Sequence, residues 1–186
     1  MTVDLHGELS GAGQASKLIH FQHLVALGVP RALLAEVRMS HWGYGVDRVE
    51  PDGDGRYQPS PQGESQVILP VYDETGELVD LVAFPTRSPH NWRVRCGQGW
   101  ALGLEQGLER YHWGEALPLH SSPLNWLRSG CVGLTVIDWT APEVAGLRDM
   151  ESIICEDARL ASVLREALTL PSRLPSIGVG EFQHAA

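Results

Sequence analysis

The chain has 186 residues, 43% of them hydrophobic, and a formal net charge of −9. This length fits one domain with or without an appendage, and the apolar content is too high for an intrinsically disordered chain. The acidic balance excludes attraction of the whole surface to nucleic acid or to anionic lipid. Any such binding must therefore use a local basic patch.

The cysteines and the N-terminal residues indicate the compartment. Cys96, Cys131 and Cys155 are odd in number, lie far apart and form no Cys-x-x-Cys motif. This pattern argues against a disulfide framework or a zinc site and is typical of a reducing cytoplasm. Residues 1–14 lack the basic start and the apolar run of a signal peptide, and no apolar run reaches about 18 residues. We expect a cytoplasmic protein that does not enter the membrane.

The N-terminal part of the chain predicts a helical hairpin. Residues 1–12 show no clear period and are expected to form a flexible N-terminus. Apolar residues then recur at helical spacing from 14 to 27. Gly28 ends this helix, and Pro30 suits the first turn of a second helix over 30–39.

The middle of the chain predicts an antiparallel β-meander. A turn rich in Gly and Asp over 51–55 indicates a first hairpin. The segment "VILPVYDETGELVDLVAF" (67–84) has two β-rich runs around a turn in which Gly76 is available for positive φ. The run "NWRVRC" (91–96) is expected to be a third strand.

The C-terminal part predicts a short helix and then a βαβα unit. Ser122 suits the N-cap of the short helix and Pro123 suits its first position. The apolar run "CVGLTVID" (131–138) indicates a buried strand, and "ESIIC" (151–155) indicates another. The chain between these two strands is long enough to form a crossover, which would allow the strands to be parallel neighbours. The amphipathic "DARLASVLREAL" (157–168) is expected to be the last helix.

These elements predict an α+β fold. We expect a single α+β domain over 13–170, in which the helical hairpin, the meander and the βαβα unit share a mixed sheet. Residues 171–186 are expected to form an irregular C-terminal tail.

An arginine-rich stretch, "FPTRSPHNWRVRCGQGWALG" (84–103), is the first candidate site. It contains no carboxylate, and strand alternation would place two of its arginines on one face. Arginine beside tryptophan is the chemistry that single-stranded nucleic acid needs. The candidate binding residues are Arg87, His90, Trp92, Arg93, Arg95 and Trp100. The alternative is a strand whose arginines pair with Asp73, Glu74, Glu77 or Asp80 and whose tryptophans lie in the core.

Three carboxylates form the second candidate site. Asp138 ends one predicted strand, and Glu156 with Asp157 ends the next. If the strands are parallel neighbours, these side chains meet at the carboxyl edge of the sheet and could hold Mg²⁺. The alternative is that each acid offsets the dipole of the helix that follows it. The chain contains no Gly-x-Ser-x-Gly, P-loop or Gly-x-Gly-x-x-Gly motif.

Residues 66–103 resemble a segment of phage and prophage primase-type proteins that precedes their Toprim domain. The resemblance rests on the hairpin "VILPVYDETGELVDLVAF" followed by "WRVRCGQGWALG". The segment also resembles conserved hypothetical proteins of GC-rich bacteria. A Toprim site needs a Glu followed by an Asp-x-Asp motif that together hold Mg²⁺, and no Asp-x-Asp follows Glu156. The resemblance therefore implies a copy without this metal site or a separate accessory module.

Together these observations predict a non-catalytic accessory protein of bacterial or phage origin, from a mobile element. It would bind single-stranded nucleic acid or a protein partner through the arginine and tryptophan surface, with no cofactor. The first alternative is a Mg²⁺-dependent phosphoryl-transfer or hydrolytic enzyme that uses Asp138, Glu156 and Asp157. The second alternative is a structural protein whose tryptophans form a homodimer interface.

Overall fold

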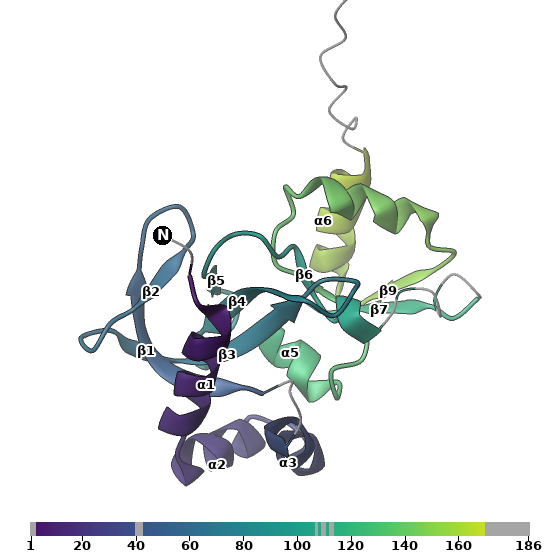
Figure 1. The fold of residues 1–186 in the computed structure, drawn as a ribbon. Coiled ribbons are helices and arrows are strands. Elements are labelled where there is room, and N and C mark those ends of the chain that lie inside the picture. Colours follow the sequence, from purple (N-terminus) through teal and green to yellow (C-terminus); the bar gives the residue numbers. More distant parts are fainter. Residues whose placement is uncertain (1–2, 40–42, 107, 109–110, 112–113, 170–186) are drawn as a thin grey trace, which may run out of the picture.

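The computed structural model describes residues 3–39, 43–106, 108, 111 and 114–169. Three helices come first, antiparallel strands follow, and shorter strands and helices complete the C-terminal half (Figure 1). The predicted α+β class is confirmed. The irregular tail predicted for 171–186 lies outside the described residues, and the single domain over 13–170 stays a prediction. Within the described part, none of the helices combines the length and apolarity needed to cross a membrane.

The N-terminal helices are α1 (Leu5–Ala15), α2 (Leu18–Ala26) and α3 (Arg31–Met39). The last two are the predicted helical hairpin. A flexible N-terminus was predicted for 1–12, whereas the structure has the helix α1 from Leu5 onward. Asp4 caps this helix by accepting a hydrogen bond from the Gly7 N–H at 2.9 Å. Three glycines within the helix conceal its period, but Leu9 and Ala12 are buried and hold it against the sheet.

The main sheet has five strands in the order β2-β1-β3-β4-β5. All neighbouring strands are antiparallel, and β3, β4 and β5 form the predicted meander. The strands are β1 (Gly45–Pro51), β2 (Tyr57–Pro59), β3 (Glu64–Tyr72), β4 (Leu78–Phe84) and β5 (Arg93–Val94).

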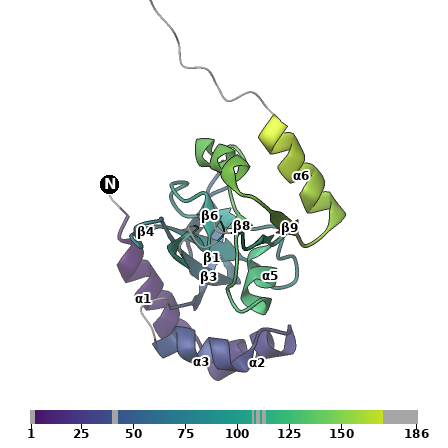
Figure 2. The same cartoon turned by 90° about the vertical axis from the view of Figure 1, so that its right-hand side faces the viewer.

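Both faces of the main sheet are covered, which explains the continuous apolar runs of β3 and β4. On one face, Ile68 of β3 and Leu81 of β4 belong to a cluster with Leu9 of α1. On the other face, Val67 and Phe84 belong to a cluster with α2, α3 and α5 (Pro123–Arg128). Figure 2 shows α1 and the α2–α3 pair packed around β1 and β3, with the C-terminal helix α6 (Ala158–Thr169) on the far side of the molecule.

The C-terminal half is built around a second core that includes Leu117, Leu134 and Leu160. Two small sheets cross it, one antiparallel (β6-β8) and one parallel (β7-β9). The elements are β6 (Ala101–Leu102), η1 (Leu104–Gln106), β7 (Leu117–Leu119), β8 (Thr135–Val136), η2 (Pro142–Asp149), β9 (Ile153–Cys155) and α6 (Ala158–Thr169).

The order of the C-terminal strands differs from the expected one. The strands over 131–138 and 151–155 were expected to be neighbours in one mixed sheet, but β9 pairs with β7 and β8 pairs with β6. A bridge between Leu119 and Leu134 joins the end of β7 to the chain just before β8. β7 therefore lies between β8 and β9. Its three residues, Leu-Pro-Leu, are too short to stand out as a strand in the sequence.

Candidate nucleic-acid interface

The loop between β4 and β5, residues 85–92, meets the carboxyl ends of β7 and β9. His90 Nδ1 lies 3.1 Å from the carbonyl oxygen of Ser121, which follows β7. The Trp92 Nε1–H donates to the carbonyl oxygen of Ile137, just after β8, at 3.2 Å. These two contacts fix the loop to the C-terminal half of the chain, so two of the predicted binding residues stand at a sheet edge where α/β proteins commonly bind ligands.

A pocket of about 250 Å³ opens at this point. Two half-buried indoles, Trp92 and Trp139, stand in its wall together with the first turn of α6. Its lining residues are His90, Trp92, Ser121, Trp139, Asp157, Arg159, Leu160 and Val163. The pocket thus combines flat aromatic surface with a small number of hydrogen-bonding and charged groups, as small-molecule sites usually do.

Arg159 is the cation of this pocket. It is exposed at the second position of α6, and within the described residues no ion pair or hydrogen bond holds its guanidinium. Asp157 stands two residues earlier and uses Oδ1 to accept the Leu160 N–H at 2.7 Å, which caps the helix. Arg159 is therefore the group that remains available for an anionic ligand.

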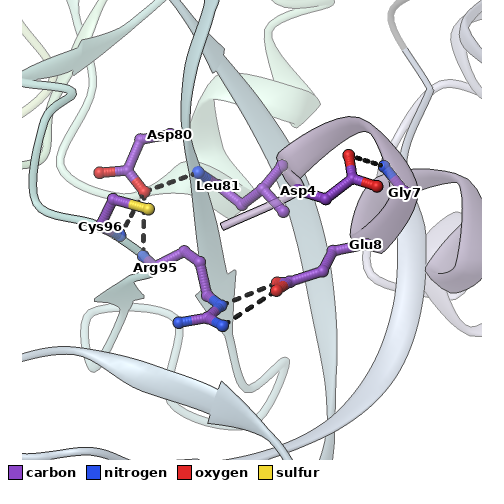
Figure 3. A network of polar contacts seen from close by, with 7 residues as sticks. All are labelled: Asp4, Gly7, Glu8, Asp80, Leu81, Arg95 and Cys96. Carbon is purple, nitrogen blue, oxygen red and sulfur yellow. Dashed lines mark hydrogen bonds and ion pairs between the residues drawn. The ribbon is translucent and has the colours of Figure 1, made fainter. Parts of the chain in front are cut away.

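Arg95, by contrast, is already paired. Its Nε and a terminal guanidinium nitrogen donate to the two carboxylate oxygens of Glu8 at 2.8 and 2.9 Å (Figure 3). This bidentate pair ties the loop after β5 to α1. The alternative of paired arginines thus holds for Arg95, but the partner lies in α1 and not in the β3–β4 hairpin.

The other candidates of the arginine-rich stretch are dispersed. Trp100 is only 8% exposed and belongs to the second core, so it is not part of the surface around Trp92. Arg93 is half-buried in β5 and forms no ion pair or side-chain hydrogen bond with the part of the chain that the structure describes. Arg87 is exposed and lines a different, larger groove beside α2.

The three candidate metal ligands each serve a local hydrogen-bond pattern. Asp138 Oδ1 accepts the N–H of Thr140 at 2.8 Å and its hydroxyl at 2.7 Å. Glu156 accepts the Ser121 N–H and hydroxyl, both at 2.9 Å, and the Asn125 amide at 2.7 Å. Glu156 therefore joins the end of β9 to the first turn of α5, and Asp157 caps α6.

These residues do not fit the Mg²⁺ site that their positions after two strands predicted. Mg²⁺ prefers several oxygen ligands in an octahedron. Asp138 follows β8 and Glu156 follows β9, with β7 between the two strands. Among the described residues, no three His, Cys, Asp or Glu side chains come together in a way that could hold a metal ion.

Glu156 also predicts a pH-dependent contribution to stability. Burial raises the pKa of its carboxyl, but the hydrogen bonds from Ser121 and Asn125 outweigh burial and bring the pKa below its ordinary value of 4.5. A lowered folded-state pKa stabilises the fold above pH 4.5, and this contribution is lost as the pH falls through the folded-state pKa.

We therefore expect Glu156→Gln to lower the free energy of unfolding at pH 7 by on the order of 1 kcal/mol or less, since the site is solvent-screened. Chemical denaturation at several pH values measures the effect. The difference between the two proteins should shrink toward pH 3. Glu151→Gln, an exposed change just before β9, should be neutral throughout. An equal loss of unfolding free energy at pH 3 and pH 7 would contradict the stabilising role assigned to the ionised Glu156 carboxylate.

Ser121, Trp139 and Arg159 were not anticipated as site residues. Each stands at or near the end of an element of the C-terminal half: Ser121 follows β7, Trp139 follows β8, and Arg159 is the second residue of α6. A search for polar or aromatic residues just after predicted strands would have found Trp139 but not Arg159, which lies within α6. It would have missed Ser121, because β7 carries no strand signal in the sequence.

No family model matches the sequence, and no curated protein matches it. Two solved structures share its fold. The E. coli primase catalytic core superposes with a TM-score of 0.57 at 13% identity, over 88% of this chain and 64% of that one. The Aquifex aeolicus primase, described as its zinc-binding and RNA polymerase domains, superposes with a TM-score of 0.55 at 12% identity, over 88% and 52%.

The chain thus spans less than two thirds of either structure. At these identities the likeness concerns the fold alone. It supports the primase-type resemblance of residues 66–103 at the level of architecture.

Proposed function

We propose that this protein is a non-catalytic accessory module, of bacterial or phage origin, that binds single-stranded nucleic acid at the pocket between loop 85–92 and α6. The observation that carries the proposal is the pairing of two half-buried indoles, Trp92 and Trp139, with the uncommitted guanidinium of Arg159 in one pocket. Stacking platforms beside cations are the usual means by which proteins bind unpaired strands without reading a long sequence.

Each pocket residue has a distinct role in this proposal. A base stacks on the indole of Trp92 or Trp139, since every base has a π-face. His90 offers its Nε2 to the base edge or sugar, while Ser121 holds the Nδ1 of His90 through its carbonyl oxygen. Arg159 contacts the adjacent phosphate as a planar donor. The carboxylate of Asp157 repels a phosphate from its side of the pocket. The phosphate is therefore expected on the Arg159 side.

Two further findings support this function. The carboxylates after β8 and β9 are engaged in caps and turns and do not fit a metal centre, which favours binding over phosphoryl transfer. The two structures that share the fold are described as primases, one of them with an RNA polymerase domain, and such proteins handle nucleic acid. The net charge of −9 restricts the binding surface to local cations such as Arg159.

The test is the affinity of a fluorescently labelled thymidine oligonucleotide, measured by anisotropy at low salt. We expect Trp139→Leu to weaken binding roughly ten-fold, as the loss of one stacked base predicts. Arg159→Ala should also weaken binding and should reduce the slope of log affinity against log salt by about 0.7, the value for one phosphate contact on a single strand.

Arg165→Ala is the matched control, because Arg165 is an exposed arginine on the same helix that lines a different hollow. It should bind like the parent protein. Circular dichroism must show that Trp139→Leu is folded. The proposal fails if the parent protein does not bind the oligonucleotide at low salt, or if Arg159→Ala and Arg165→Ala behave alike.

A further inference from the structure

A larger groove lies on the other side of loop 85–92, against α2. It has a volume of about 940 Å³. Its floor is formed by the buried side chains of Leu24, Val46 and Val67, and Ile19 of α2, 64% exposed, stands at its rim. This groove is the largest of the described hollows, and neither the indole pocket nor its proposed ligand accounts for it.

Polar groups surround the apolar floor of this groove. Arg87 is exposed and, in the described part of the chain, has no ion pair or hydrogen bond. The amides of Gln22 and Asn91 and the imidazole of His20 also line the groove. His23 Nε2 lies 2.9 Å from the Thr86 hydroxyl, which fixes the loop to α2. The cation suits the phosphate of a nucleotide, and the amides and the imidazole suit the edge of its base. The apolar floor suits the face of the base.

Loop 85–92 forms the ridge between the two hollows. Asn91 lines the α2 groove, whereas its neighbours His90 and Trp92 line the indole pocket. Consecutive residues therefore face opposite sides of the same ridge. Both sides of the ridge are anchored, by the His23–Thr86 contact on one and the His90–Ser121 contact on the other. A single strand of nucleic acid that is held at Trp92 reaches the α2 groove by crossing loop 85–92 alone.

We infer that the nucleic-acid site extends over this ridge, so that the α2 groove holds the next part of the same strand with a phosphate on Arg87. This inference rests on the proposed function and adds a second subsite to it. Glu64 lines the groove as well and repels phosphate, so the backbone of the strand is placed on the Arg87 side and the bases on the apolar floor.

The experiment compares a thymidine trinucleotide with a thymidine dodecanucleotide, each labelled and titrated by anisotropy. The dodecanucleotide should bind more tightly to the parent protein, because only it spans both hollows. Arg87→Ala should weaken the dodecanucleotide roughly five-fold and reduce its salt slope by about 0.7, while leaving the trinucleotide unchanged. Arg31→Ala is the matched control, an exposed arginine of α3 that lines neither hollow, and should change neither affinity.

The outcomes separate the two proposals. If neither oligonucleotide binds, the proposed function and the second subsite both fail. If both bind but Arg87→Ala changes neither affinity, or changes both equally, the second subsite alone is overturned, and the groove with its exposed Ile19 is left to a protein partner. An equal effect of Arg31→Ala would also overturn it, because the loss would then reflect net charge and not a contact.

Discussion

Asp80→Asn is expected to lower the free energy of unfolding by about 3 kcal/mol or more. Asp80 is completely buried in β4, and its carboxylate accepts hydrogen bonds from five backbone N–H groups. One oxygen accepts from Leu81, Arg95 and Cys96, at 2.8 to 3.0 Å, as Figure 3 shows. The other accepts from Gln98 and Gly99, at 2.8 and 3.3 Å.

The size of the expected loss follows from what an amide would do in the same place. Asparagine keeps one acceptor oxygen and replaces the other with an NH₂ group, which faces backbone donors. Each buried donor left without an acceptor destabilises the fold by about 1–3 kcal/mol. The surrounding chain also fits closely: a Cβ on Gly99 would lie 2.5 Å from a methyl carbon of Val71, so the loop has little room to rearrange.

Urea denaturation measures this change, and an unaltered slope would show that the unfolded state is unaffected. Asp73→Asn is the matched control. Asp73 stands in the turn of the same hairpin and also accepts several hydrogen bonds, from Thr75 and Glu77, but it is only partly buried. The Asp73→Asn variant should lose less than about 1 kcal/mol of its free energy of unfolding. A loss from Asp80→Asn no greater than that of Asp73→Asn would refute the role assigned to the buried carboxylate.

The Asp80 site also connects the fold with the proposed interface. The carboxylate fixes residues 95–99 directly after β5, and the Arg95–Glu8 pair holds the same segment to α1. Loop 85–92 enters β5 at its other end. Its position is therefore set from both sides, by the Asp80 network and by the contacts of His90 with Ser121 and of Trp92 with Ile137. A loop held in this way presents its side chains with little loss of conformational entropy on binding.

Local patterns predicted much of the fold. The alternation and turn chemistry of 67–84 correspond to β3 and β4, and Ser122 with Pro123 marks the start of α5. Strands and caps of this kind are determined by neighbouring residues, so they can be recognised in a single sequence. The helix α1 could not be recognised in this way. Its stability comes from the packing of Leu9 and Ala12 on the sheet and not from its glycine-rich segment.

Pairings between distant residues were beyond prediction. Glu8 and Arg95 are 87 positions apart, and nothing in either neighbourhood specifies the other. The same limit applies to the indole pocket, where loop 85–92, Ser121, Trp139 and Arg159 come from four separate segments. The arginine-rich stretch directed attention to His90 and Trp92, but strand alternation could not show that Arg95 is paired and Trp100 is buried.

Glu105→Gln is expected to stabilise the protein at pH 8 and to have almost no effect near pH 4. Glu105 lies half-buried in η1, and burial raises the pKa of its carboxyl from the ordinary 4.5 to about 7, although its backbone hydrogen bonds partly oppose this rise. The folded state therefore holds this proton more tightly than the unfolded state. Stability is highest while the carboxyl is protonated in both states, below pH 4.5, and falls as the pH rises toward 7.

The pKa rise corresponds to roughly 3 kcal/mol at alkaline pH, so the neutral amide should increase the free energy of unfolding by about 2–3 kcal/mol at pH 8. Unfolding in urea at several pH values between 4 and 8 measures the gain, which should grow mainly between pH 4.5 and 7. Glu143→Gln, at an exposed carboxyl in η2, removes the same charge and should show no such growth. A gain that is independent of pH would mean that the amide improves packing and that the buried charge of Glu105 does not destabilise the fold.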